Sequence, residues 1–217
     1  MTICKTLISI DWLGILQTAV AIFAAWTAYS ALHTWRVQTK AQRHSDYLDT
    51  LTDTVHEYIQ SLNAPIQMLS FIHIGIESHK GYTLPSDSPP SKYANVIAYI
   101  ERRGEEDSKK LWGYLNKNEL VVAKIDSLVA RGQIYGFKNF DTCRDSIRVL
   151  LWQSRRLQAV AAIVGSIHSN WEHPDVIKSI ESLLAVKQTD IESHVQQSNI
   201  DYLSFVAENY RNIYPDA

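Results

Sequence analysis

A stretch without charged residues near the N-terminus is the strongest constraint on this chain. No Asp, Glu, Lys or Arg lies between Asp11 and Arg36, and the 24 residues from Trp12 to Trp35 are mainly apolar. A helix of that length measures roughly 36 Å, slightly more than the hydrocarbon core of a bilayer, which is about 30 Å thick. Trp12 and Trp35 stand at its ends, where amphipathic aromatic rings prefer the membrane interface. The sequence therefore predicts one transmembrane helix over these residues.

Two other interpretations of this stretch compete with a transmembrane helix. A soluble buried helix is suggested by polar residues such as Gln17 and His33 and by the high alanine content. A cleaved secretory signal is suggested by Lys5, which precedes the apolar run, and by the small residues of the run at 19–21. Asp11 interrupts the order expected of a signal peptide, and the apolar run continues well past the small residues. A retained membrane anchor is favoured.

The flanking cations predict the orientation of this anchor. Lys5 is the only basic residue before it, whereas Arg36, Lys40 and Arg43 follow it with no acid until Asp46. Loops rich in Lys and Arg stay on the cytoplasmic side. We therefore expect a single-pass protein of a bacterial-type inner (plasma) membrane, with its N-terminal tail (residues 1–11) outside and its C-terminal part in the cytoplasm.

After the anchor, the hydrophobic pattern continues with a helical period. Residues 36–62 are predicted to form an amphipathic helix that continues from the span, with apolar residues at alternating steps of four and three. This seam consists of Val37, Ala41, His44, Leu48, Leu51, Val55, Tyr58 and Leu62. Such a seam is typical of a coiled coil or of a helix packed along a bundle. The sequence does not distinguish packing between chains from packing within one chain.

Acidic residues and a histidine occupy the positions opposite the seam. They are Asp46, Asp49, Asp53, His56 and Glu57. Carboxylates and histidine at helical spacing are also a pattern that binds metals. Because they lie opposite the apolar seam, we interpret them as a solvated face, and no metal or cofactor is predicted.

The remainder, residues 63–217, is predicted to be a helical domain. Pro65 should end or kink the preceding helix, and residues 65–76 are apolar on nearly every side. They are too short to span a bilayer, so we expect a core helix or one lying against the membrane, with a short strand as the alternative. Residues 81–91, which carry three prolines, form the one clear loop.

Helix start and stop residues divide the rest of this domain. We expect helices from Ser91 to about Gly104, over 105–131 with an interruption near Gly113 or residues 116–118, from the caps Asp141 and Thr142 to about Ile167, and over 176–210. The predicted fold is all-α: one N-terminal transmembrane helix that continues into a cytosolic helical bundle of about five helices, the first of them coiled-coil-like.

Charge and motifs exclude several functional classes. The formal net charge is −2 and the basic residues are scattered, so no nucleic-acid surface is predicted. Phosphate-binding glycine loops, zinc-protease and serine-hydrolase signatures and paired zinc cysteines are absent. The least implausible catalytic site combines Cys143, the only cysteine after the span, with His168, His173 and the nearby Ser166.

One tripeptide is similar to a known family motif. His173-Pro174-Asp175 resembles the sequence with which J-domain co-chaperones engage Hsp70, and it lies between two predicted helices as it does in that family. The preceding helix of J-domains is strongly basic, but residues 159–171 here contain no Lys or Arg. Proline at a first helical position is the simpler interpretation. The Arg-to-His spacing of HEPN ribonucleases, another helical family, does not occur.

The remaining functional prediction is interaction with proteins. Five small residues of the predicted span fall on one helix face, at steps of four and three: Gly14, Thr18, Ala21, Ala25 and Ala28. Such a face allows two membrane helices to approach closely. We expect a non-catalytic membrane-anchored protein that binds a protein partner or senses a signal, as a homo-oligomer. The alternatives are an oligomerising membrane-disrupting effector, such as a toxin or a defence protein, and an unrecognised enzyme.

Overall fold

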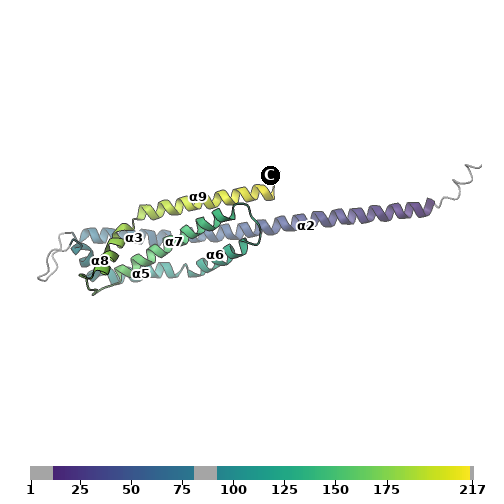
Figure 1. The fold of residues 1–217 in the computed structure, drawn as a ribbon. Coiled ribbons are helices and arrows are strands. Elements are labelled where there is room, and N and C mark those ends of the chain that lie inside the picture. The colour runs from purple at the N-terminus through teal and green to yellow at the C-terminus, as the bar shows by residue number, and fades with distance from the viewer. Residues whose placement is uncertain (1–11, 81–91, 216–217) are drawn as a thin grey trace, which may run out of the picture. The chain divides into compact units, whose positions relative to one another are not determined.

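The computed structural model describes residues 12–80 and 92–215, and every regular element in those ranges is a helix (Figure 1). The elements are α2 (Trp12–Ser61), α3 (Asn63–Ser78), α4 (Ala94–Tyr99), the π-helical segment η1 (Ile100–Gly104), α5 (Glu105–Asn116), α6 (Glu119–Gly132), α7 (Phe140–Val164), α8 (Pro174–Ala185) and α9 (Gln188–Ile213). The all-α prediction is confirmed. The predicted tail 1–11 and the proline-rich loop 81–91, with the proposed cap Ser91, lie outside the described residues.

The chain divides into two compact units, Met1–Asp46 and Tyr47–Ala217. The first contains the predicted span and the first part of the amphipathic segment, both within the single helix α2. The second contains the end of α2 and all the later helices.

The boundary between α2 and α3 follows the proline prediction. Pro65 has no N–H to donate to the carbonyl one turn earlier, and α2 ends at Ser61 while α3 begins at Asn63. The side chains of α3 are buried at a helical period, at positions 65, 66, 68, 69, 72 and 76. The alternative of a strand in this segment is therefore wrong. Phe71 and Ile74 stay exposed because they lie on the other face of α3.

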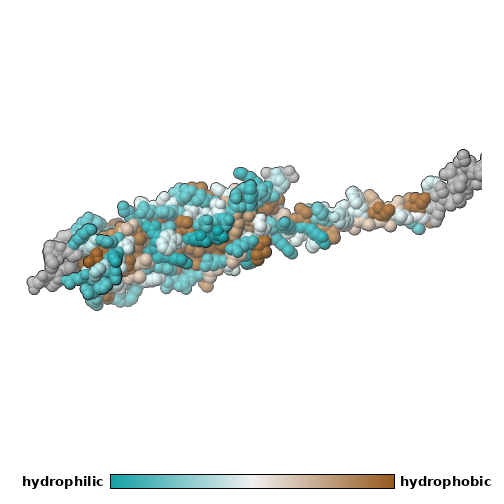
Figure 2. Space-filling model, in the orientation of Figure 1, coloured by the Kyte–Doolittle hydropathy of each residue, from teal (hydrophilic) through white to brown (hydrophobic). Residues whose placement is uncertain are grey.

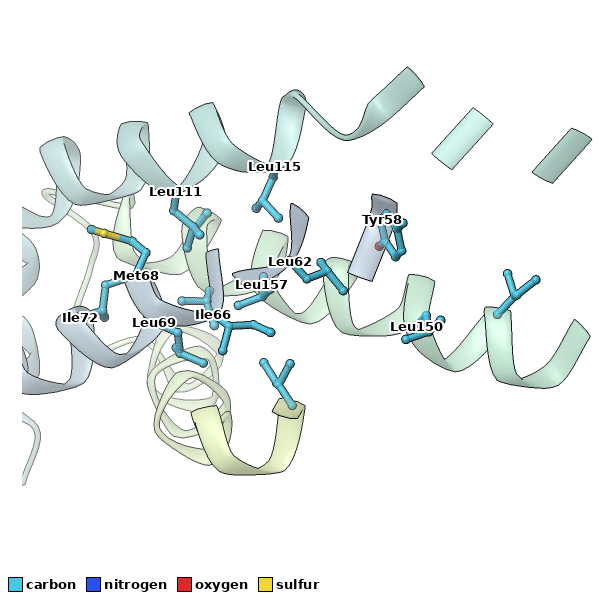
Figure 3. Packing of buried hydrophobic residues seen from close by; sticks show 14 of the residues in the cluster. Tyr58, Leu62, Ile66, Met68, Leu69, Ile72, Leu111, Leu115, Leu150 and Leu157 are labelled. Carbon is cyan, nitrogen blue, oxygen red and sulfur yellow. The ribbon is translucent and has the colours of Figure 1, made fainter. Parts of the chain in front are cut away.

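The core of the second unit brings together residues far apart in the sequence. Leucines of α5 and α7 meet the side chains of the α2–α3 segment, and Figure 3 shows them pointing toward one another. The residues include Tyr58, Leu62, Ile66, Leu69, Leu111, Leu115, Leu150 and Leu157. In addition, α7 lies alongside α9 and packs against α5. Burial of these apolar side chains is the main stabilising contribution to the fold.

Gly104 does not end a helix, contrary to the sequence prediction. It closes η1, which leads directly into α5. A Cβ atom at Gly104 would lie 2.2 Å from the backbone oxygen of Val164, and one at Gly165 would lie 2.6 Å from the Ser108 Oγ. The Ser108 hydroxyl donates a hydrogen bond to the Ala161 carbonyl, at 2.8 Å. Glycine is needed here because two backbones cross closely, rather than to terminate a helix.

The aromatic loop between α6 and α7 packs onto α2 at Tyr47, where the part of α2 that belongs to the second unit begins. The Tyr47 ring stacks on Tyr135 and Phe137, with centroids 4.7 and 5.3 Å away, and its hydroxyl donates to the Leu128 carbonyl at 2.8 Å. The Asn209 side chain on α9 accepts a hydrogen bond from the Lys138 N–H and donates one to the Lys138 carbonyl, both at 3.0 Å. These contacts fix the loop between α2 and α9.

Helix ends in the second unit follow the predictions in part. Gly132 ends α6 and Pro174 begins α8, as expected, and α5 ends at Asn116 inside the predicted interruption. The start of α7 is two residues earlier than the cap prediction. The predicted single helix over 176–210 is wrong, because Val186 and Lys187 are extended and separate α8 from α9.

Candidate membrane segment

The predicted span lies in α2 with its large apolar side chains uncovered. Within the described residues, α2 supplies the one helical segment that is long and apolar enough to cross a bilayer, and none of its most apolar window is buried. The exposed side chains include Trp12, Leu13, Ile15, Leu16, Val20, Ile22, Phe23, Trp26, Tyr29, Leu32 and Trp35. In Figure 2 this part of α2 is mostly brown and pale. A contiguous apolar surface of this kind marks a site of membrane or protein contact.

The threonine hydroxyl groups of the span are satisfied inside the helix. Thr18, Thr27 and Thr34 each donate a hydrogen bond to a backbone carbonyl three or four residues earlier, at 2.8 to 3.0 Å. A hydroxyl that is bonded internally costs less to place in hydrocarbon than one that needs water. The threonines are therefore compatible with a membrane location.

The small-residue face is open along this segment. Thr18, Ala21, Ala25 and Ala28 are exposed and Gly14 is partly exposed. Phe23 lies two residues from Ala21, which places it about 200° around the helix and so on the opposite face. The span thus has one face of small residues and another of bulky ones.

Part of the predicted seam of α2 packs into the core of the same chain. Leu48, Leu51, Val55, Tyr58 and Leu62 belong to the core of the second unit, and each is fully buried there. In the first unit, Val37 is 56% exposed and Ala41 is partly exposed. Opposite the seam, Asp46, Asp49, Asp53 and Glu57 are exposed and His56 is partly exposed. The buried part of the seam is not available to a second chain while the unit is folded.

The structure does not assemble the catalytic pair that involves Cys143. This thiol is fully buried near the start of α7, and burial raises its pKa to about 12. His168 and His173 follow the other end of α7, and the 22 residues from Cys143 to Val164 span about 30 Å of helix. A buried, protonated thiol that far from both histidines has no base to activate it. The structure therefore does not bring Cys143 together with either histidine.

His168 takes part in a carboxylate cluster that joins η1 to the segment between α7 and α8. The Glu101 carboxylate accepts hydrogen bonds from the His168 backbone N–H and from Trp171 Nε1, both at 2.9 Å, and lies 3.0 Å from His168 Nδ1. Ser166 instead donates to the Ile163 carbonyl. The serine is therefore not activated by the histidine, and the cluster serves to position the backbone.

His173-Pro174-Asp175 begins α8 in the way the simpler interpretation predicts. Pro174 is the first helical residue, and His173 Nδ1 accepts a hydrogen bond from the Asp175 N–H at 3.2 Å. The histidine side chain is thereby used as a helix cap. The local geometry accounts for this tripeptide without a co-chaperone partner.

A cavity between α6 and α7 was not predicted. It measures about 570 Å³ and is lined by side chains of both helices, including three arginines of α7. The sequence shows the helical spacing of these arginines. It does not show that α6 packs opposite them and closes a cavity. Across residues 12–80 and 92–215, no group of three or more His, Cys, Asp or Glu side chains is arranged to hold a metal ion.

Comparison with known proteins yields no relative for this chain. No protein-family model matches it, and neither a curated protein nor a solved structure shows significant similarity.

Proposed function

We propose that this chain is a non-catalytic, single-pass membrane protein whose helical body binds a protein partner or senses a signal. The observation that carries the proposal is the uncovered apolar surface of α2 from Trp12 to Trp35. Its threonine hydroxyl groups are bonded internally, as a hydrocarbon environment requires.

The proposed location is a bacterial-type inner membrane. The second unit, here called the body, is proposed to be a helical bundle on the cytoplasmic side. Arg36, Lys40 and Arg43 support this orientation because they follow the span and are exposed. The same helix that carries the span contributes Tyr47 to the aromatic cluster and Leu48 to the core. We propose that a rearrangement of the body is transmitted to the span along α2.

The proposed assembly is a homo-oligomer held through the small-residue face of the span. Close approach of two membrane helices needs small side chains, and this face provides Gly14, Ala21 and Ala28 along its length. The buried seam from Leu48 to Leu62 does not contribute, because it is occupied within the chain.

Disulfide cross-linking in membranes tests this assembly. In a Cys4→Ser background, we expect Ala21→Cys to form disulfide-linked dimers on mild oxidation, read on non-reducing gels. Phe23→Cys is the matched control, since it lies at nearly the same depth on the opposite face and should remain monomeric. Cys143 is buried and does not compete. Equal cross-linking at both positions, or none at Ala21→Cys, would contradict self-association through this face.

A membrane-disrupting effector is the second candidate, favoured by the same open small-residue face. Strong induction of such a protein should depolarise cells, as reported by a potential-sensitive dye. Gly14→Leu or Ala21→Leu should remove the effect, because a bulky side chain prevents close helix approach. A normal membrane potential under strong induction would exclude this function while leaving the anchored interaction protein intact.

A further inference from the structure

The cavity between α6 and α7 has the size and lining of a small-ligand site. Its volume, about 570 Å³, falls in the range of roughly 300 to 1,000 Å³ that is usual for such sites. Its lining combines Asp126 from α6 with three arginines, Trp152 and several aliphatic side chains of α7. Apolar side chains thus form much of the wall, with charged groups among them.

Three of the four charged residues that line the cavity are arginines. Arg144, Arg148 and Arg155 share one face of α7, at spacings of four and seven residues. Asp126 is the one carboxylate in the lining. Asp141 and Asp145, which pair with Arg144 and Arg148, lie outside the lining. These carboxylates offset the charges of Arg144 and Arg148, so an anion in the cavity would be attracted mainly by Arg155, which forms no ion pair with a described residue.

The arginines retain donors that the protein does not use. Arg144 Nη2 pairs with Asp141 at 2.8 Å, but its Nε is buried without a hydrogen bond, and Asp145 Oδ1 is 3.7 Å from it. Arg155 makes no hydrogen bond or ion pair with any described residue and is exposed. A buried donor without a partner is costly, and a bound acceptor would satisfy it.

A buried phenol lies close to the same charges. The Tyr58 side chain is fully buried, and its hydroxyl has no partner with hydrogen-bond geometry. Burial raises its pKa to about 12; the nearby Ser154 hydroxyl and the charge of Arg155 oppose that shift, while the charge of Asp126 adds to it. Two lining residues, Arg155 and Asp126, are thus close enough to Tyr58 to act on its phenol, although Tyr58 itself does not line the cavity.

Trp152 gives the cavity an aromatic wall. Its side chain is 56% exposed although it lies among the apolar lining residues Val149 and Leu151. An exposed indole beside guanidinium groups can stack on a flat apolar ligand while the arginines hold its anionic group. Both parts of the lining then contribute to binding.

We propose that the α6–α7 cavity binds a small organic anion, with a carboxylate or phosphate held by Arg148 and Arg155 and an apolar or aromatic body against Trp152. A soluble metabolite and an anionic lipid both offer this chemistry. The inference is independent of how the chain is anchored, because all the groups belong to the second unit.

Binding of ATP to the full chain in phosphatidylcholine nanodiscs tests the soluble source. We expect saturable binding by equilibrium dialysis, and Arg148→Gln/Arg155→Gln should weaken it at least about tenfold, since charge-assisted bonds to phosphate are lost. Both arginines are exposed, so the double variant should fold. Lys124→Gln/Arg211→Gln removes two exposed charges outside the cavity and should change the affinity by less than about twofold.

Two further arms complete the test. Trp152→Ala should weaken the binding of ATP more than the binding of inorganic phosphate, because phosphate has no flat body to stack on the indole. If the source is lipid, ATP will not bind, and phosphatidylglycerol nanodiscs will raise the thermal unfolding temperature of the wild type but not of Arg148→Gln/Arg155→Gln. The proposal is overturned if neither ATP nor phosphatidylglycerol has an effect, or if the effect persists in the double arginine variant.

Discussion

Replacing Val20 and Phe23 together with arginine should release the chain from membranes. Both residues lie near the middle of the apolar segment and are exposed. Each arginine at the centre of a spanning helix opposes insertion by about 2.5 to 3.5 kcal/mol, so the pair should lower insertion by more than about a thousandfold. Wild-type protein should remain in the pellet after alkaline carbonate extraction of membranes, and the double variant should move to the supernatant or be degraded.

A matched variant separates this effect from a change in total charge. Gln60→Arg/Gln67→Arg adds the same two charges at exposed positions of α2 and α3 in the second unit. It should stay in the membrane fraction like the wild type. If the wild type itself were extracted by carbonate, the proposed anchor would be refuted, and the apolar segment would have to bind another protein.

Shortening Leu51 to alanine should destabilise the second unit strongly, whereas the same kind of change at Val37 should not. Leu51 is fully buried in the core, and removing a buried leucine side chain costs about 2 to 5 kcal/mol. Val37 belongs to the same predicted seam but is 56% exposed, so Val37→Ala should change stability by less than about 0.5 kcal/mol. Denaturant unfolding of the full chain in detergent micelles, followed by tryptophan fluorescence, measures the change in unfolding free energy for each variant.

This pair of variants also distinguishes core packing from a coiled coil between chains. If the whole seam joined two chains, both substitutions would weaken the assembly, and the unfolding midpoint would depend on protein concentration. We expect a midpoint independent of concentration for the second unit. A similar loss at Val37 and Leu51 would contradict the assignment of the seam to the core.

The features that were predictable from the sequence depend on local physics. Periodic apolar residues identified α2, the missing N–H of Pro65 identified its end, and Gly132 and Pro174 marked two further helix boundaries. Each of these signals acts within one turn of the residue that carries it. Local rules are therefore sufficient for such boundaries.

The features that were missed depend on contacts between distant segments. The break between α8 and α9 contains neither Gly nor Pro; the chain is extended there, and the Val186 carbonyl lies 2.8 Å from His73 Nε2 of α3. Gly104 looks like a helix stop because glycine often ends helices. In the structure its missing side chain instead lets the backbone pass close to that of Val164. The α6–α7 cavity likewise needs the pairing of two helices, which no local pattern specifies.

The contacts of α9 imply an order of events during synthesis. Asn209 holds the loop at Lys138, and Tyr202, which is fully buried, shares a hydrogen bond with Thr52, so the final helix completes the core. It follows every other described helix in the sequence and so leaves the ribosome after them. The apolar segment of α2 emerges earlier, since chains are made from the N-terminus at about 5 to 20 residues per second. The nascent chain therefore offers its apolar segment for membrane insertion well before the body can close.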